Sequence, residues 1–239
     1  MGTKAPPTKV VLVPWDPDSP EHVERMVQQR LACGWNASHV PEWQKRQRKG
    51  RKNLQWVIID ESDPNQQQYI SKHITTFPKQ STALVDTASS LGAKPRQLVS
   101  SLSFIPVGHI SLDTEYENPE LNDPTPGVFF ICAFWISETL QGMGLGRAAM
   151  DIVEGTAISE PLCAKRLALS TPNKDDPTRV DRFVALKKDL PKVTNQEWYG
   201  RRGYEVYRNV DQMWSEDDET GKTWWVPGVF MKKDIADKG

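Results

Sequence analysis

Residues 128–152 have the sequence VFFICAFWISETLQGMGLGRAAMDI, and this stretch decides the fold. Its first ten residues are mostly apolar and carry no charge, which predicts a strand buried on both faces. Three glycines punctuate the loop Gln141–Arg147 that follows. Beyond the loop, apolar residues recur at helical spacing, namely Ala148, Ala149, Met150, Ile152 and Val153.

A strand, a glycine-rich loop and a helix N-terminus in succession are suited to binding an anion. Glycine adopts positive φ and lets the backbone approach a ligand closely. The first N–H groups of a helix have no intrahelical partner, so they point at an anion placed there. We therefore expect a phosphate or pyrophosphate at residues 141–147.

Two familiar phosphate loops do not match. A Walker A loop needs Lys-Ser or Lys-Thr after its last glycine, and none follows here. A Rossmann fingerprint needs G-x-G-x-x-G near the start of a βαβ unit, whereas this chain has G-x-G-x-G past its middle.

Gln141-Gly142-Met143-Gly144-Leu145-Gly146 resembles the acetyl-CoA loop of the GCN5-related N-acetyltransferases (GNAT), which has the form [RQ]-x-x-G-x-[GA]. Tyr199-Gly-Arg-Arg-Gly-Tyr204 is similar to a second GNAT segment, Y-x-x-x-G-[FY]. Gly108-His-Ile-Ser-Leu112 resembles the strand that precedes the cofactor strand in that family, antiparallel to it. The resemblance implies a mixed α/β (α+β) fold, with a largely antiparallel central sheet splayed at the cofactor strand and helices on both faces.

The composition argues against several classes of protein, among them polyanion-binding, disulfide-rich and membrane proteins. The 239 residues carry a net charge of −1, which does not indicate a general polyanion-binding role. The three cysteines are far apart and show no metal-ligand or disulfide spacing. The longest apolar run is too short to span a bilayer, and the N-terminus does not resemble a signal peptide. We expect a cytoplasmic protein with no metal, membrane or nucleic-acid partner.

Local signals place the elements of the first half. Strands are expected at 9–14 and 54–60, and Ser19 followed by Pro20 predicts the start of a helix that ends before Gly34. Six basic residues within 42–52 favour a solvated helix face. A phosphate-rich partner, an acidic substrate and the 3′-phosphate of the cofactor are the alternatives for this run. Residues 82–90 give weak helical hints.

The second half continues the pattern. Residues 103–113, 164–171, 204–210 and 224–232 predict strands, 146–158 predicts a helix, and 215–222 predicts an acidic hairpin tip. Thr194 with Glu197 predicts a capping box. We expect a disordered tail at 1–8, a single acetyltransferase domain at 9–233 with insertions near 60–100 and 172–193, and a tail at 234–239.

The resemblance also implies roles for individual residues. Tyr199 corresponds to the family's general acid, which protonates the departing thiolate of CoA. The edge of the cofactor strand would bind the pantetheine arm, and the loop amides would bind the pyrophosphate, with Arg147 as a charge partner. An asparagine of the family that contacts the cofactor corresponds to either Asn173 or Asn195. The cofactor-binding set is Phe134, Trp135, Ile136, Gln141, Gly142, Met143, Gly144, Leu145, Gly146, Arg147, Asn173 and Asn195.

The general base has several candidates. Glu138, at the end of the cofactor strand, comes first, followed by Asp113 and Glu115, with His109 as a further alternative. Cys132 lies within an apolar run, where an inert buried thiol is expected.

These observations predict an N-acetyltransferase that uses acetyl-CoA, releases CoA and needs no metal. The amine would attack the thioester directly in a ternary complex, and main-chain N–H groups would polarise the thioester carbonyl. A small-molecule amine is the expected acceptor and a protein acceptor the alternative, with the chain a monomer or homodimer. A non-catalytic CoA-binding regulatory or interaction protein is the second hypothesis.

Overall fold

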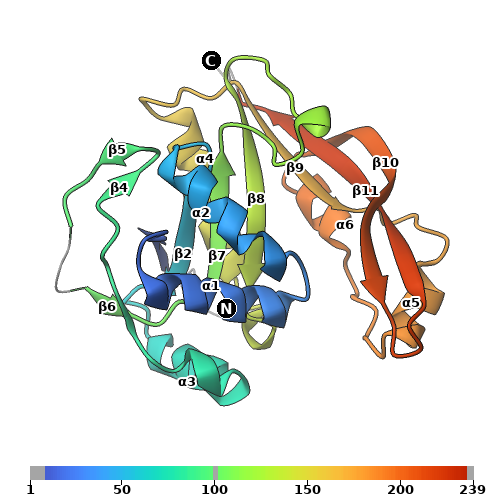
Figure 1. Ribbon diagram of the computed structural model, residues 1–239, viewed down its shortest axis with the longest axis horizontal. Coiled ribbons are helices and arrows are strands. Elements are labelled where there is room, and N and C mark those ends of the chain that lie inside the picture. The colour runs from blue at the N-terminus through green and yellow to red at the C-terminus, as the bar shows by residue number, and fades with distance from the viewer. Residues whose placement is uncertain (1–8, 99–101, 236–239) are drawn as a thin grey trace, which may run out of the picture. The chain divides into compact units, whose positions relative to one another are not determined.

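The computed structural model describes residues 9–98 and 102–235, so the predicted tail at 1–8 and most of that at 234–239 lie outside the described residues. The chain divides into two compact units, Met1–Cys163 and Ala164–Gly239, which we describe separately (Figure 1). The prediction of one domain over 9–233 stays a prediction.

The first unit is built on four antiparallel strands in the order β1-β2-β7-β8. β7 pairs with β8 as expected. β1, β2 and β8 begin and end within one residue of their predicted bounds, whereas the strand predicted at 103–113 begins only at Gly108, because Ser103 and Phe104 pair separately with Val85 and Leu84. These strands are β1 (Val10–Pro14), β2 (Leu54–Ile59), β7 (Gly108–Asp113) and β8 (Val128–Ile136).

Helices cover both faces of these strands. α1 and α2 lie in front of the strands in Figure 1, and α4 lies behind them. Their bounds are α1 (Pro20–Cys33), α2 (Val40–Arg48) and α4 (Leu145–Ile158), with the 3-10 turns η1 (Ala37–His39) and η3 (Pro119–Leu121) in the connections. α1 begins as predicted, because the Ser19 side chain accepts a hydrogen bond from the His22 N–H, and it ends at Gly34 in a left-handed conformation.

Tryptophans dominate the core beneath α1 and α2. Alternate residues of a strand point to opposite faces, so Leu54, Trp56 and Ile58 share one face of β2. They pack with residues of the two helices, of β1 and of the position directly after β1, namely Val13, Trp15, Met26, Val40 and Trp43. This apolar layer fixes both helices to the sheet.

The segment between β2 and β7 differs most from expectation. It holds α3 (Gln66–Thr76), which the sequence did not predict, followed by η2 (Pro78–Gln80). The helical hints at 82–90 were wrong, because these residues form short extended pairs rather than a helix. The pairs are β3 (Leu84–Val85) with β6 (Ser103–Phe104), and β4 (Ser90–Leu91) with β5 (Lys94–Pro95).

The second unit contains three antiparallel strands in the order β9-β11-β10. The strands are β9 (Arg166–Pro172), β10 (Glu205–Asp217) and β11 (Thr223–Asp234), and the helices are α5 (Arg179–Ala185) and α6 (Asn195–Gly200). The predicted capping box is present, since Thr194 and Glu197 exchange hydrogen bonds at the start of α6. β10 is longer than predicted and continues into the expected hairpin tip.

Candidate functional site

The end of β8 is interrupted by a bulge. His109 of β7 faces Trp135 and Ser111 faces Cys132, so one residue of β7 opposes both Ala133 and Phe134. Ala133 has φ +45°, a conformation that few non-glycine residues adopt. A bulge leaves main-chain groups out of the regular ladder and redirects the side chains beside it, which is common next to binding sites.

The glycine-rich loop follows this strand through the short turn η4 (Glu138–Leu140). Gly142 and Gly144 have φ +81° and +88°, so both need the left-handed conformation that glycine tolerates. Gly144 is the N-cap of α4 and provides no side-chain hydrogen bond, and the first turn of α4 contains no acidic residue. The initial N–H groups of α4 are therefore suited to an anion.

Close packing fixes the base of the loop. A Cβ added at Gly146 would lie 3.5 Å from Cζ of Phe134 and 3.8 Å from Cγ1 of Ile136, so these β8 side chains support the first turn of α4. Gln141 donates through Nε2 to the Ile136 carbonyl at 3.3 Å. The side chains of Gln141 and Arg147 are exposed. The structure thus brings the predicted residues from 134 to 147 into one strand end and loop.

The candidate general bases lie in different environments. Glu138 is exposed in η4, just before the loop. Asp113 is buried and bound to Nζ of Lys52 at 2.9 Å, and the Ser111 hydroxyl also donates to it. Glu115 is paired with Arg46 at 3.1 Å and with Arg51 at 3.5 Å. Among these carboxylates, Glu138 is the one that the fold leaves beside the loop.

His109 is a core residue held from both sides. Its ring stacks on Trp135 with centroids 5.8 Å apart, and Arg30 donates to Nε2 at 3.2 Å. Because Arg30 has no acceptor atom, the ring proton lies on Nδ1, which is 2.8 Å from Oε1 of Gln29. Burial, followed by the charges of Arg30 and Lys52, holds the pKa of His109 well below its usual value. These contacts favour packing over proton transfer.

The thiol of Cys132 is similarly unsuited to chemistry. Burial and then the charge of Asp113 raise its pKa well above the usual value, so the group stays protonated. This agrees with the inert thiol expected from the sequence.

A polar cluster beside α2 had no sequence signal. Glu117, in the loop after β7, lies 2.8 Å from Nδ1 of His39 and accepts from the indole N–H of Trp43 at 3.2 Å. Arg30 and Lys52 lie over the faces of the Trp43 ring, at 5.3 and 4.6 Å from its centroid. These residues are far apart in the chain, and only the fold brings them together.

The second unit contains the remaining predicted site residues. Tyr199 is buried in α6, with its ring 5.0 Å from that of Trp198 and 5.9 Å from that of Tyr204. Asn173 follows β9 and accepts from the Asp175 N–H, whereas Asn195 is the first residue of α6. The Lys174 N–H donates to the Gln196 side chain at 2.7 Å, which holds these two segments together. The choice between Asn173 and Asn195 therefore stays open.

Over the described ranges 9–98 and 102–235, no group of three or more His, Cys, Asp or Glu side chains is placed to hold a metal ion. Within the same ranges, every helix is too short or too polar to cross a membrane.

Comparisons with known proteins identify the class of fold. Residues 81–179 match the model of the acetyltransferase (GNAT) family. A search of curated proteins finds no match.

Solved structures with the same fold cover nearly the whole chain. An aminoglycoside 6′-N-acetyltransferase complexed with coenzyme A has a TM-score of 0.51 and 12% identity, covering 96% of this chain and 99% of its own. Arabidopsis thaliana NAA60 in complex with acetyl-CoA has a TM-score of 0.50 and 11% identity, with 96% and 100% covered. A putative phosphinothricin N-acetyltransferase has a TM-score of 0.50 and 12% identity, with the same coverage. These similarities confirm the predicted mixed α/β fold with its mostly antiparallel sheet.

Proposed function

We propose that this chain, whose residues 81–179 match the model of the acetyltransferase (GNAT) family, is a member of that family and transfers the acetyl group of acetyl-CoA to a primary amine. The observation that carries this proposal is the loop Gln141–Arg147. It joins a bulged strand to a helix N-terminus, with positive φ at two glycines and no acidic residue in the first helical turn. Such a terminus suits the pyrophosphate of CoA, and two solved structures of this fold contain coenzyme A or acetyl-CoA.

In the proposed complex, each part of the cofactor has its own protein contacts. The main chain of Phe134, Trp135 and Ile136 binds the pantetheine arm. The loop amides bind the pyrophosphate, Arg147 adds a positive charge, and Asn173 or Asn195 contacts the cofactor. Main-chain N–H groups at the bulge of Ala133 and Phe134 polarise the thioester carbonyl.

The chemistry needs one base and one acid. An amine must lose a proton to become a nucleophile, and the exposed Glu138 beside the loop is the proposed base. The neutral amine then attacks the thioester carbon directly, forming the amide bond as the carbon–sulfur bond breaks. Tyr199 gives its proton to the departing thiolate, so CoA leaves as the thiol. The nitrogen releases its extra proton to water as the amide forms, and water returns a proton to the Tyr199 phenolate.

A small-molecule amine is the proposed acceptor. Two structures of the same fold are named for enzymes whose acceptors are an aminoglycoside and, for the putative enzyme, phosphinothricin. Fold and cofactor do not fix the acceptor, so a protein amine is the alternative. The proposal includes a cytoplasmic location and a chain that acts as a monomer or homodimer. A non-catalytic CoA-binding regulatory protein is the competing function.

Isothermal titration tests the proposal first. The purified protein is titrated with acetyl-CoA and, separately, with an adenine dinucleotide as the control for a general nucleotide site. We expect micromolar binding of acetyl-CoA and none of the dinucleotide. A screen of small amines, with release of the CoA thiol as the readout, then seeks turnover. A folded sample that does not bind acetyl-CoA would remove the cofactor and the proposed reaction together.

A further inference from the structure

Ser137 lies between β8 and η4, and its N–H, its carbonyl and its hydroxyl each form a hydrogen bond. It is fully buried, its N–H donates to the Val107 carbonyl at 2.8 Å, and its carbonyl accepts from the Leu140 N–H at 2.9 Å. A serine at the N-cap usually caps the following turn with its own hydroxyl. Here that hydroxyl makes no cap and instead lies 2.9 Å from Nδ1 of His73.

His73 comes from the last turn of α3 and is also fully buried. Its ring packs against Phe77 with centroids 5.4 Å apart, and Phe77 packs edge-on against Trp135 of β8 at 6.1 Å. Burial, followed by the charge of Arg25, lowers the pKa of His73 to about 4, although the nearby Gln80 side chain opposes this. The ring is therefore neutral at pH 7.

The neutral ring completes a specific hydrogen bond. Nδ1 of the neutral ring and the Ser137 hydroxyl share this bond, in which the tautomer of the ring decides the donor, and Oγ of Ser137 also lies 3.3 Å from the Thr139 hydroxyl within η4. The hydroxyl of Ser137 thus joins α3 to η4, whose last residue directly precedes the loop. A serine beside a histidine is also the arrangement of an activated nucleophile. Both side chains have 0% exposure, so no acyl donor reaches this hydroxyl.

We propose that His73 is a positioning residue, which fixes the loop Gln141–Arg147 for the cofactor through its hydrogen bond to Ser137. This inference rests on the proposed function in one respect, namely that the loop binds acetyl-CoA. Without the imidazole, the buried Ser137 hydroxyl would lose its hydrogen-bond partner on α3. Because a buried hydroxyl without a partner is costly, η4 would change conformation to provide another one. The glycines of the loop would then sample more conformations in the free protein. Ordering them on binding would cost more free energy and would weaken the affinity for acetyl-CoA.

The test compares His73→Leu, Ser137→Ala and the double variant with the unchanged protein. Hydrogen exchange over residues 138–147 is measured without ligand, and acetyl-CoA affinity is measured by titration. We expect faster exchange over these residues and about tenfold weaker binding in each single variant. The double variant should be no weaker than either single one, because both remove the same bond. In turnover, KM for acetyl-CoA should rise about tenfold while kcat at saturation stays within about twofold.

Two further variants separate positioning from general stability. His73→Asn returns an acceptor near Nδ1 and should restore most of the affinity. His22→Leu is the matched control: His22 is another buried histidine, whose Nε2 lies 2.9 Å from the Val85 carbonyl and which contacts no residue of η4 in any described hydrogen bond. It should lower the melting temperature without changing exchange at 138–147.

The outcomes are distinct. If Ser137→Ala and His73→Leu lower the melting temperature but leave both exchange at 138–147 and acetyl-CoA affinity unchanged, the positioning role is wrong. If the unchanged protein does not bind acetyl-CoA, the proposed function fails. The exchange measurement then still decides whether His73 orders the loop, because it needs no ligand.

Discussion

Tyr199 is the single residue that separates an enzyme from a CoA-binding regulatory protein. Replacing Tyr199 by Phe removes only the hydroxyl, which is the proposed proton donor to the departing thiolate. A general acid contributes about 10²- to 10⁴-fold to a rate. We therefore expect kcat to fall by about 100-fold while the Kd for acetyl-CoA, measured by titration, stays within about twofold.

Tyr204→Phe provides the matched control. Tyr204 is buried, and its ring lies 5.9 Å from that of Tyr199 in the same unit. This variant should keep kcat within about twofold. If Tyr199→Phe also keeps its rate, the acid is another group or the chain works as a regulatory protein.

Single residues also show where sequence analysis succeeds and where it stops. Positive φ is present at Gly142 and Gly144, where a short local pattern determines it, whereas Gly146 lies in the first turn of α4. His73 and Ser137 lie 64 residues apart, and their hydrogen bond follows from the packing of α3 on η4. The sequence did not predict α3, so the contact was not predictable either.

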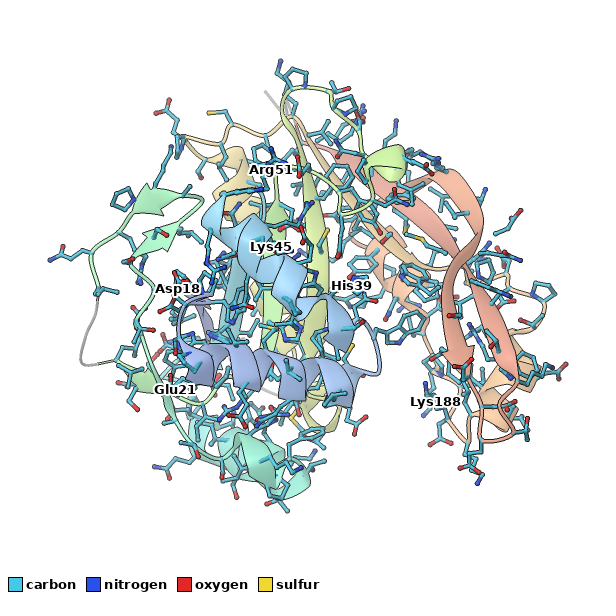
Figure 2. All side chains as sticks on the ribbon, viewed as in Figure 1. Asp18, Glu21, His39, Lys45, Arg51 and Lys188 are labelled. Carbon is cyan, nitrogen blue, oxygen red and sulfur yellow. The ribbon has the colours of Figure 1, made fainter. Side chains whose placement is uncertain are left out.

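At the scale of elements, α2 divides its positive charges between solvent and core. Lys45 lies on its exposed side (Figure 2) and pairs with Glu42 at 3.0 Å. Arg46, the next residue, is buried and pairs with Glu115 at 3.1 Å, and it also donates to the Glu115 carbonyl at 2.9 Å. Arg46 therefore holds the loop after β7 against α2.

Arg46 and Lys45 are neighbours in α2, and we expect their replacement by alanine to differ in its effect on stability. Arg46→Ala should lower the free energy of unfolding by about 2 kcal/mol, because it removes a buried stem and two charge-assisted hydrogen bonds. Lys45→Ala is the control and should cost less than about 0.5 kcal/mol, as exposed ion pairs do. Urea denaturation measures both. Equal, small losses would mean that Arg46 does not hold the loop.

The basic residues within 42–52 also show that the sequence of a helix does not determine which of its charges become buried. A solvated helix face was the favoured interpretation, and it describes Lys45 but not Arg46 or Lys52. Lys52 is fully buried against Asp113, 61 residues away. Local patterns predicted the bounds of α1 and α4, the start of α6 and the positions of the main strands, because caps and hydrophobic periodicity are local signals. Which charges become buried depends on residues that are distant in the chain.

For the whole molecule, buried neutral histidines connect stability to pH. His22, His73 and His109 are each at most 1% exposed, and burial lowers the pKa of all three. The folded state therefore binds fewer protons than the unfolded chain, whose histidines titrate near 6.5. Their contribution to stability is complete above pH 6.5 and is lost progressively as the pH falls toward each folded-state pKa.

The size of this loss can be worked out for His73. One pKa unit corresponds to about 1.4 kcal/mol, and the pKa of His73 in the folded state is about 4. Between pH 6.5 and pH 5 the free energy of unfolding should therefore fall by about 2 kcal/mol from this histidine alone. Any other buried histidine that stays neutral at pH 5 should add a similar loss. Carboxylates whose pKa is lowered, such as Asp218 at about 2, lose their contribution below this window.

Urea denaturation at pH 7, 6 and 5, followed by tryptophan fluorescence, measures the dependence. His73→Asn should reduce the loss between pH 7 and pH 5 by about 2 kcal/mol, because asparagine does not titrate, even though the variant is less stable at pH 7. A free energy of unfolding that stays constant from pH 7 to pH 5 would mean that protons reach these rings in the folded protein as readily as in the unfolded chain. The buried Ser137–His73 bond would then not be held by a neutral imidazole.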